Sequence, residues 1–268
     1  MSDNFNFPVK CGYERVAPGD FVFVELTDLY HMYMLSPSTF ISPLMNTSKS
    51  ISFSGMFDNC NELRFVNNID TSSAQLTSYM FSNCPNIKKI PYMDLGDNTS
   101  MDYMFHNCSS LMYLPQLNTQ NVRNMDSCFY GCTNLIEIPQ LDTRYLEFAN
   151  YAMYHCVGLR YIPLLDFGNM YSMMYFFSDG EDVEFHDLTD LGGFENLGKF
   201  EQASGMDYGF LSRLPNLTHQ SLMNVINNLY DRKSAGYHEL YIDFGSKNLA
   251  KLTDDEISIA VNKGWVLI

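Results

Sequence analysis

The chain has 268 residues, of which 46% are hydrophobic and 15% aromatic, enough for a well-packed core. Its net charge of −15 at pH 7 repels phosphate backbones and anionic lipid, which argues against nucleic acid and membrane surfaces as direct partners. No stretch of 18 apolar residues occurs, so the sequence predicts no membrane-spanning helix and no membrane insertion.

Residues 1–50 do not follow the period that organises the next part of the chain. Residues 20–26 form a mainly apolar run after Pro18 and Gly19, which predicts a strand. We expect residues 1–50 to be an N-terminal cap on the first repeat or a segment that attaches the protein to a larger assembly. The first residues lack the basic and apolar stretches of a secretory signal peptide, so we expect synthesis in the cytoplasm without that export route.

Residues 51–199 carry a repeat with a period of 24 residues. Aromatic, aliphatic, proline and acidic positions recur with the cysteines, so the match extends over many columns. A fixed period of this length predicts an array of stacked coils, here about six. The cysteines that mark the period are Cys60, Cys84, Cys108, Cys132 and Cys156.

Each coil is predicted to hold a short helix and a short parallel strand. Apolar residues within 122–132 have the spacing of a helical stripe, and Asn or Gly before most of the repeat cysteines suits a left-handed helix end. Segment 135–141 is aliphatic and β-branched, which predicts the strand. The predicted fold class is therefore an α/β solenoid of 24-residue coils capped at both ends.

Residues 200–268 are predicted to form helix–strand repeats and a C-terminal cap. Residues 218–230 form an amphipathic pattern with Thr218 as the N-cap, and 239–244 alternate like a strand. Thr253 and Glu256 have the spacing of a capping box, which begins a helix that ends before Gly264. The last four residues are predicted to be a strand.

Seven cysteines raise the alternatives of disulfides or a zinc site. The odd number and the regular spacing favour reduced thiols that form a ladder in the core. Cys128 and Cys132 have a spacing that could bind zinc, but Cys128 stands where three other copies have Met, so core filling explains it better. We predict no metal and no cofactor.

An acidic column also recurs with the period. Stacked carboxylates could hold Ca²⁺ through their oxygens, but Ca²⁺ requires six to eight oxygen ligands, so capping of turns or helices is the favoured interpretation. The column consists of Asp70, Asp94, Asn118, Asp142, Asp166 and Asp190.

No catalytic motif stands out. None of the six histidines is part of a metal-binding helix motif, and neither a nucleophile elbow nor a phosphate-binding loop occurs. We therefore expect no enzymatic activity, and a glycan-active or peptide-active enzyme is the alternative from another class.

The variable positions of the strand segments are the best candidates for a partner-binding face. Tyr and Arg are frequent among binding hot spots, although an ordinary solvated strand face is the alternative interpretation. The candidates are Lys88, Lys89, Tyr92, Tyr113, Gln116, Glu137, Gln140, Arg160 and Tyr161.

The motif Met-Phe-x-x-Cys-x-x-Leu, best seen from Met104 to Leu111, resembles the BspA-like leucine-rich repeats in their Met-Phe-x-x-Cys variant. The tail 248–265 is similar to the tails of such proteins from gut anaerobes and their phages. The resemblance implies a leucine-rich-repeat fold and non-enzymatic binding of protein.

BspA-like surface proteins carry export signals, which we do not find in this chain. We therefore expect a component of a bacteriophage virion, either structural or used in host recognition, whose partners are other virion proteins or a host surface receptor. A bacterial cell-surface adhesin is the alternative, and self-association into a homo-oligomer is compatible with both.

Overall fold

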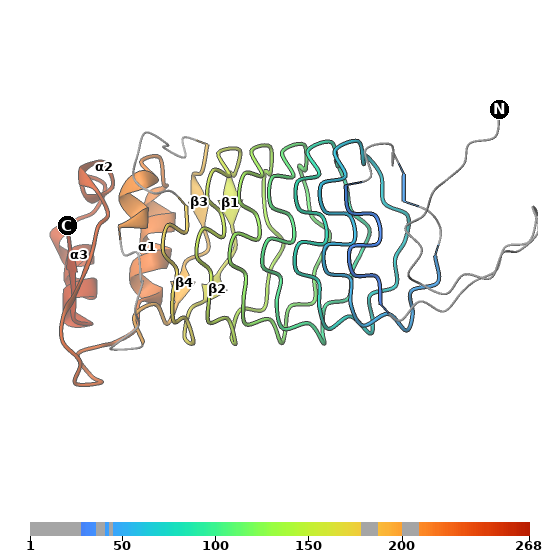
Figure 1. Ribbon diagram of the computed structural model, residues 1–268. Coiled ribbons are helices and arrows are strands. Elements are labelled where there is room, and N and C mark those ends of the chain that lie inside the picture. Colours follow the sequence, from blue (N-terminus) through green and yellow to red (C-terminus); the bar gives the residue numbers. More distant parts are fainter. Residues whose placement is uncertain (1–27, 36–40, 43–44, 178–186, 200–208) are drawn as a thin grey trace, which may run out of the picture.

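The computed structural model describes residues 28–35, 41–42, 45–177, 187–199 and 209–268. Cys11 and the strand predicted at 20–26 lie outside this part of the chain. Figure 1 shows an elongated stack of coils with helices at its C-terminal end. Parallel bridges join positions 24 residues apart in successive coils, such as Ser52 with Leu76 and Asn124 with Phe148.

The helices predicted within the coils are wrong, because the described part of residues 51–199 contains no α-helix. The six residues before a repeat cysteine, such as 102–107, form turns instead. The amides of Tyr103 and Phe105 each donate to a carbonyl of the next coil at 2.9 Å, whereas the amide of Met104 donates to the carbonyl three residues before it. A helix would direct all of these amides within one segment. The amides that bond to the next coil are therefore incompatible with a helix.

Left-handed backbone explains why turns form here. The residue before each repeat cysteine has a positive φ, as the residue types had indicated for Asn59, Asn83, Asn107 and Gly131. His155 adopts the same conformation with a φ of 58°. Because inward-facing positions recur every three or four residues in these turns, the sequence imitates the apolar spacing of a helix.

The strands are also shorter than predicted, and no continuous sheet crosses the described coils. β1 (Tyr161–Ile162) pairs in parallel with β3 (Asp190–Leu191), and β2 (Leu165–Asp166) pairs with β4 (Phe194–Glu195). Elsewhere the strand segments meet only in single bridges. Proline has no amide hydrogen and cannot donate to a ladder, which limits the pairing. The repeated prolines are Pro91, Pro115, Pro139 and Pro163.

The core consists of side-chain ladders that run along the stack. The rings of Phe57, Phe81, Phe105 and Phe129 are stacked with centroids 5.6–5.8 Å apart. The six cysteines of the described residues form no disulfide and are buried, as expected for a reduced ladder. Burial raises the pKa of the Cys132 thiol to about 12, so this thiol stays protonated at neutral pH.

Each repeat thiol also links its coil to the preceding one. The Sγ atom of Cys108 donates a hydrogen bond to the carbonyl oxygen of Phe81 at 3.1 Å, and that of Cys132 donates to Phe105 at 3.0 Å. The same contact recurs at Cys60, Cys84 and Cys156. The thiols are therefore donors between coils as well as small core residues.

The C-terminal part begins with the 3₁₀-helix η1 (Phe210–Arg213) and helix α1 (His219–Asn228). As predicted, Thr218 is the N-cap of α1, and its hydroxyl accepts a hydrogen bond from the amide of Ser221. Strand β5 (Leu240–Ile242) follows and pairs in parallel with β6 (Trp265–Leu267).

Helix α2 (Ser246–Leu249) and helix α3 (Asp254–Asn262) lie between these two strands in the sequence. The predicted capping box of Thr253 and Glu256 begins α3, and Gly264 after its end has a φ of +85°. Within the described ranges, no helix has the length and apolar character needed to cross a membrane.

Candidate functional site

All nine residues predicted for partner binding lie on equivalent segments of four successive coils, at 87–95, 111–119, 135–143 and 159–167. Every one of them is exposed. The side chains of Tyr92, Tyr113 and Tyr161 have exposed fractions of 61%, 47% and 42%. We call these nine residues the variable face.

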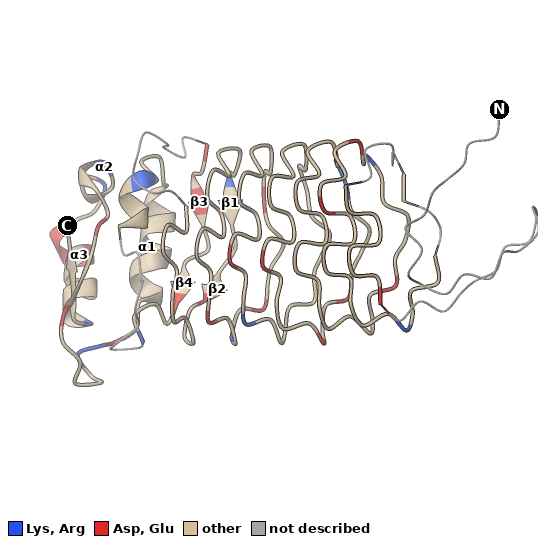
Figure 2. Ribbon diagram, in the orientation of Figure 1, with Lys and Arg blue, Asp and Glu red and all other residues tan. Residues whose placement is uncertain are grey.

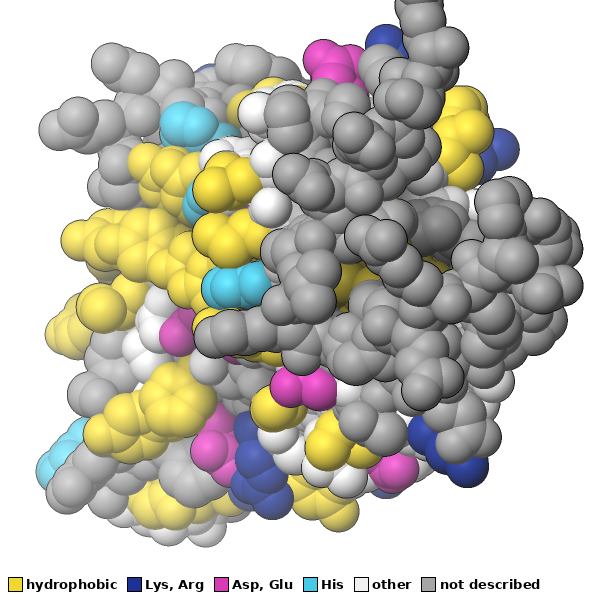
Figure 3. All heavy atoms as spheres, turned by 45° about the vertical axis from the view of Figure 1, so that its right-hand side comes forward, with side chains coloured by type: hydrophobic (Ala, Val, Ile, Leu, Met, Phe, Trp, Pro, Cys, Tyr) yellow, Lys and Arg dark blue, Asp and Glu magenta, His cyan; other side chains and the backbone are white. Residues whose placement is uncertain are grey.

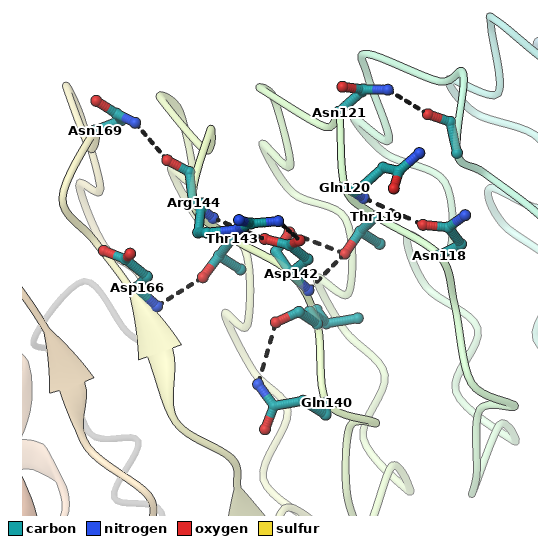
Figure 4. A network of polar contacts seen from close by, with 12 residues as sticks. Asn118, Thr119, Gln120, Asn121, Gln140, Asp142, Thr143, Arg144, Asp166 and Asn169 are labelled. Carbon is teal, nitrogen blue, oxygen red and sulfur yellow. Dashed lines mark hydrogen bonds and ion pairs between the residues drawn. The ribbon is translucent and has the colours of Figure 1, made fainter.

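Three members of the variable face line a common groove with a volume of about 580 Å³, namely Tyr92, Gln116 and Gln140. The other six lie outside its lining. The groove also contains Arg144 and Glu195, which the sequence pattern did not single out. Figure 4 shows much of this region, where polar side chains of neighbouring coils contact one another.

Gln116 and Gln140 hold the coils together as well as lining the groove. The side-chain amide of Gln116 donates to the carbonyl of Gln140 at 2.5 Å, and that of Gln140 donates to the carbonyl of Leu164 at 2.8 Å. Because both contacts reach the next coil, these two positions have a structural role that exposure alone does not indicate.

Buried threonines, which were not predicted from the sequence, fix the wall of the groove. The hydroxyl of Thr119 donates to the carbonyl of Asp142 at 3.0 Å and accepts from its amide at 2.9 Å. Thr143 accepts from the amide of Asp166 in the next coil at 2.7 Å (Figure 4). The signal was a threonine directly after the acidic column in several copies.

The acidic column caps turns, as favoured from the sequence. A side-chain oxygen of Asp70, Asp94 and Asp166 accepts a hydrogen bond from the amide two residues later, at 3.0, 3.0 and 2.7 Å respectively. Asp190 differs, because its carboxylate accepts from the hydroxyl of Thr189. No group of three or more His, Cys, Asp or Glu side chains placed to hold a metal ion is found among the residues that the structure describes.

Charge is unevenly distributed along the groove. Arg144 donates to both carboxylate oxygens of Asp142 at 3.0 and 2.7 Å, and this hydrogen bonding lowers the pKa of Asp142. Asp166 and Glu195 line the groove further toward the C-terminus, on β2 and β4, where Figure 2 shows acidic positions. That end of the groove is therefore acidic.

Comparison with known proteins identifies the repeat family. A family model described as "Mycoplasma protein of unknown function, DUF285" matches residues 24–113, 51–164 and 99–182. These overlapping ranges together cover more than half of the chain. The chain belongs to this family. Overlapping matches are the pattern expected of a repeat, which supports the BspA-like resemblance at the level of a repeat family, while the Met-Phe-x-x-Cys variant stays a prediction.

Other comparisons add little to the DUF285 assignment. A search of curated proteins finds no match. A solved structure titled "Crystal structure of TLR13-ssRNA13 complex" is similar over 82% of this chain, with 13% identity and a TM-score of 0.27. The match covers 45% of that chain, so the DUF285 protein corresponds to less than half of its length.

Proposed function

We propose that this DUF285 protein is a non-enzymatic repeat protein that binds another protein through the variable face. One observation carries the proposal: exposed side chains differ from coil to coil, whereas the positions between them remain apolar and buried, such as Ile87, Leu111 and Leu135. The fold uses the buried set together with the inter-coil contacts of Gln116 and Gln140, which leaves the other exposed side chains available to specify a partner.

The chemistry of the variable face favours a protein partner. Three exposed tyrosines and Arg160 are residue types enriched at binding hot spots. Lys88, Lys89 and Glu137 supply charges of both signs, which suits the polar rim of a protein interface. The net charge of −15 disfavours nucleic acid as the alternative partner.

A photo-crosslinking experiment tests this proposal directly. A benzophenone amino acid placed at Tyr113 is expected to capture one specific protein when the gene is expressed in its native context. The same probe at Tyr241, which is 62% exposed on β5, serves as the control and is expected not to capture it. Capture of the same protein from both positions, or of none from Tyr113, would contradict the proposal.

The proposed setting is a bacteriophage virion, in which the protein is structural or recognises the host, and the support is the resemblance to repeats in phages of gut anaerobes. A cell-surface adhesin of the BspA-like type is the alternative. Mass spectrometry of purified phage particles separates the two settings, because a virion component is retained in the particles at a fixed copy number. A protein found only in the bacterial envelope would exclude the virion.

A further inference from the structure

A second surface lies on the turns rather than on the strand segments. Aromatic rings of successive coils stack there, with centroids 4.6 Å apart for Tyr79 and Tyr103 and 4.8 Å apart for Tyr130 and Tyr154. Figure 3 shows hydrophobic side chains and histidines gathered in a band on one face of the molecule. We name this surface the tyrosine ridge. It consists of Tyr79, Tyr103, His106, Tyr130, Tyr151, His155 and Tyr175, and the buried ring of Tyr154 stacks beneath it.

The fold does not require tyrosine at these turns. Tyr79, Tyr103, Tyr151 and Tyr175 have φ values of 54–60°, a left-handed conformation that a bulky residue rarely adopts. Gly55 and Ser127 occupy the same position in other coils with φ values of 60° and 53°. Small residues therefore satisfy the same turn, and a side chain that favours another backbone conformation points to a role outside folding.

The charged side chains of the ridge's turns are acidic. The turn segments 54–59, 78–83, 102–107, 126–131 and 150–155 contain no Lys or Arg, but they contain Asp58, Asp102 and Asp126. Burial raises the pKa of Tyr79, and the neighbouring Tyr103, Asp102 and Asp58 raise it further, so the two carboxylates act on the ridge electrostatically.

Asp58 adds a further carboxylate close to the ridge. Its side chain is only 8% exposed, and its Oδ1 atom is buried without a hydrogen-bond donor in the described structure. A buried carboxylate oxygen without a donor is unfavourable, and a ligand could donate to this atom only if the turn moved.

We propose that the tyrosine ridge binds an arginine-rich segment of a protein partner. The guanidinium group both stacks on aromatic rings and donates to carboxylates, which are the two chemical features that the ridge presents. The overall charge of −15 attracts such a segment over longer distances. The variable face carries Lys88, Lys89 and Arg160 instead, so the two surfaces suit partners of different charge. The inference therefore does not depend on the proposed function.

Calorimetry with a short synthetic peptide of alternating Arg and Gly tests the ridge. The pair of substitutions Asp102→Asn and Asp126→Asn follows the chain's own precedent, because Asn150 occupies the equivalent position. We expect this variant to bind the peptide about tenfold more weakly, since two carboxylates lose their charge. A peptide of alternating Glu and Gly is expected not to bind.

A charge-matched control separates contact from general attraction. Asp70→Asn with Asp94→Asn changes the net charge equally, and Asn118 is the precedent in that column. We expect this control to retain binding within about threefold, because long-range attraction is screened by salt. Equal weakening by both pairs, binding of the Glu peptide, or no binding of the Arg peptide by the unmodified protein would overturn the proposal.

The rings are tested by Tyr103→Ser with Tyr151→Ser, for which Ser127 is the precedent. We expect this variant to lose about tenfold in peptide affinity at an unchanged net charge, as expected of hot-spot tyrosines. An unchanged affinity in a folded variant would overturn the ring contacts. If the variant does not fold, as judged by its melting curve, the Asn pairs still decide the outcome.

Discussion

At the scale of the residue, the repeat cysteine combines two properties. Cys108 is completely buried, so its thiol fills space in the core. Its Sγ atom also donates a hydrogen bond to the carbonyl oxygen of Phe81 in the preceding coil at 3.1 Å. A small thiol therefore suits the position better than an aliphatic side chain of the same volume.

Substitution at Cys108 distinguishes these two properties. If the donor matters, stability is expected to decrease in the order Cys, Ser, Ala, because Ser retains a donor and Ala leaves a small void, with a total loss of about 1–2 kcal/mol for Ala. Urea unfolding of the three proteins under reducing conditions measures the order. If Ser is less stable than Ala, the site is governed by packing alone and the hydrogen bond contributes nothing.

At the scale of the element, the sequence predicted local chemistry better than secondary structure. The capping box at Thr253 and the left-handed residues before the cysteines were found because each depends on one or two side chains. The helices within the coils were wrong because the apolar spacing of 122–132 fits both a helix and successive turns. The difference lies in hydrogen bonds to the next coil, which a single segment does not reveal.

The left-handed turn gives a prediction at Asn59, whose φ is 60°. Asn59→Gly is expected to leave stability nearly unchanged, whereas Asn59→Ala is expected to cost about 1 kcal/mol, because a Cβ atom disfavours this conformation. Thermal melting of the two variants beside the unmodified protein measures the difference. An alanine variant as stable as the glycine variant would show that the turn tolerates another backbone conformation.

At the scale of the whole molecule, the exposure of the nine positions of the variable face could be predicted from the sequence, because they lie between the apolar positions of a periodic segment. The groove and the tyrosine ridge could not, since both combine side chains 24 residues apart whose contacts depend on how the coils stack. Tyr79 and Tyr103 illustrate this point, because their period is visible in the sequence but their stacking at 4.6 Å is not.

The stacked fold predicts how a destabilising substitution in one coil affects its neighbours. Leu135 is completely buried, so Leu135→Asp places an unpaired charge in the core and is expected to unfold the adjacent coils. The amides of Cys132 and Leu159 each form a hydrogen bond within a turn close to Leu135. In hydrogen exchange, these amides are expected to lose protection before the amides of α1 and α3. Thr133→Asp, at an exposed position, is the control. Simultaneous loss in the coils and helices would indicate a single cooperative unit.

The thiol contacts have a practical consequence. Every repeat cysteine is inaccessible to reagents in solution while its coil packs against the preceding one. Each of them lies at a different junction, meaning the contact between two successive coils. The chain therefore contains natural reporters. The rate at which an alkylating reagent modifies each cysteine, read by peptide mass spectrometry, reports the opening of that junction, and no cysteine has to be introduced.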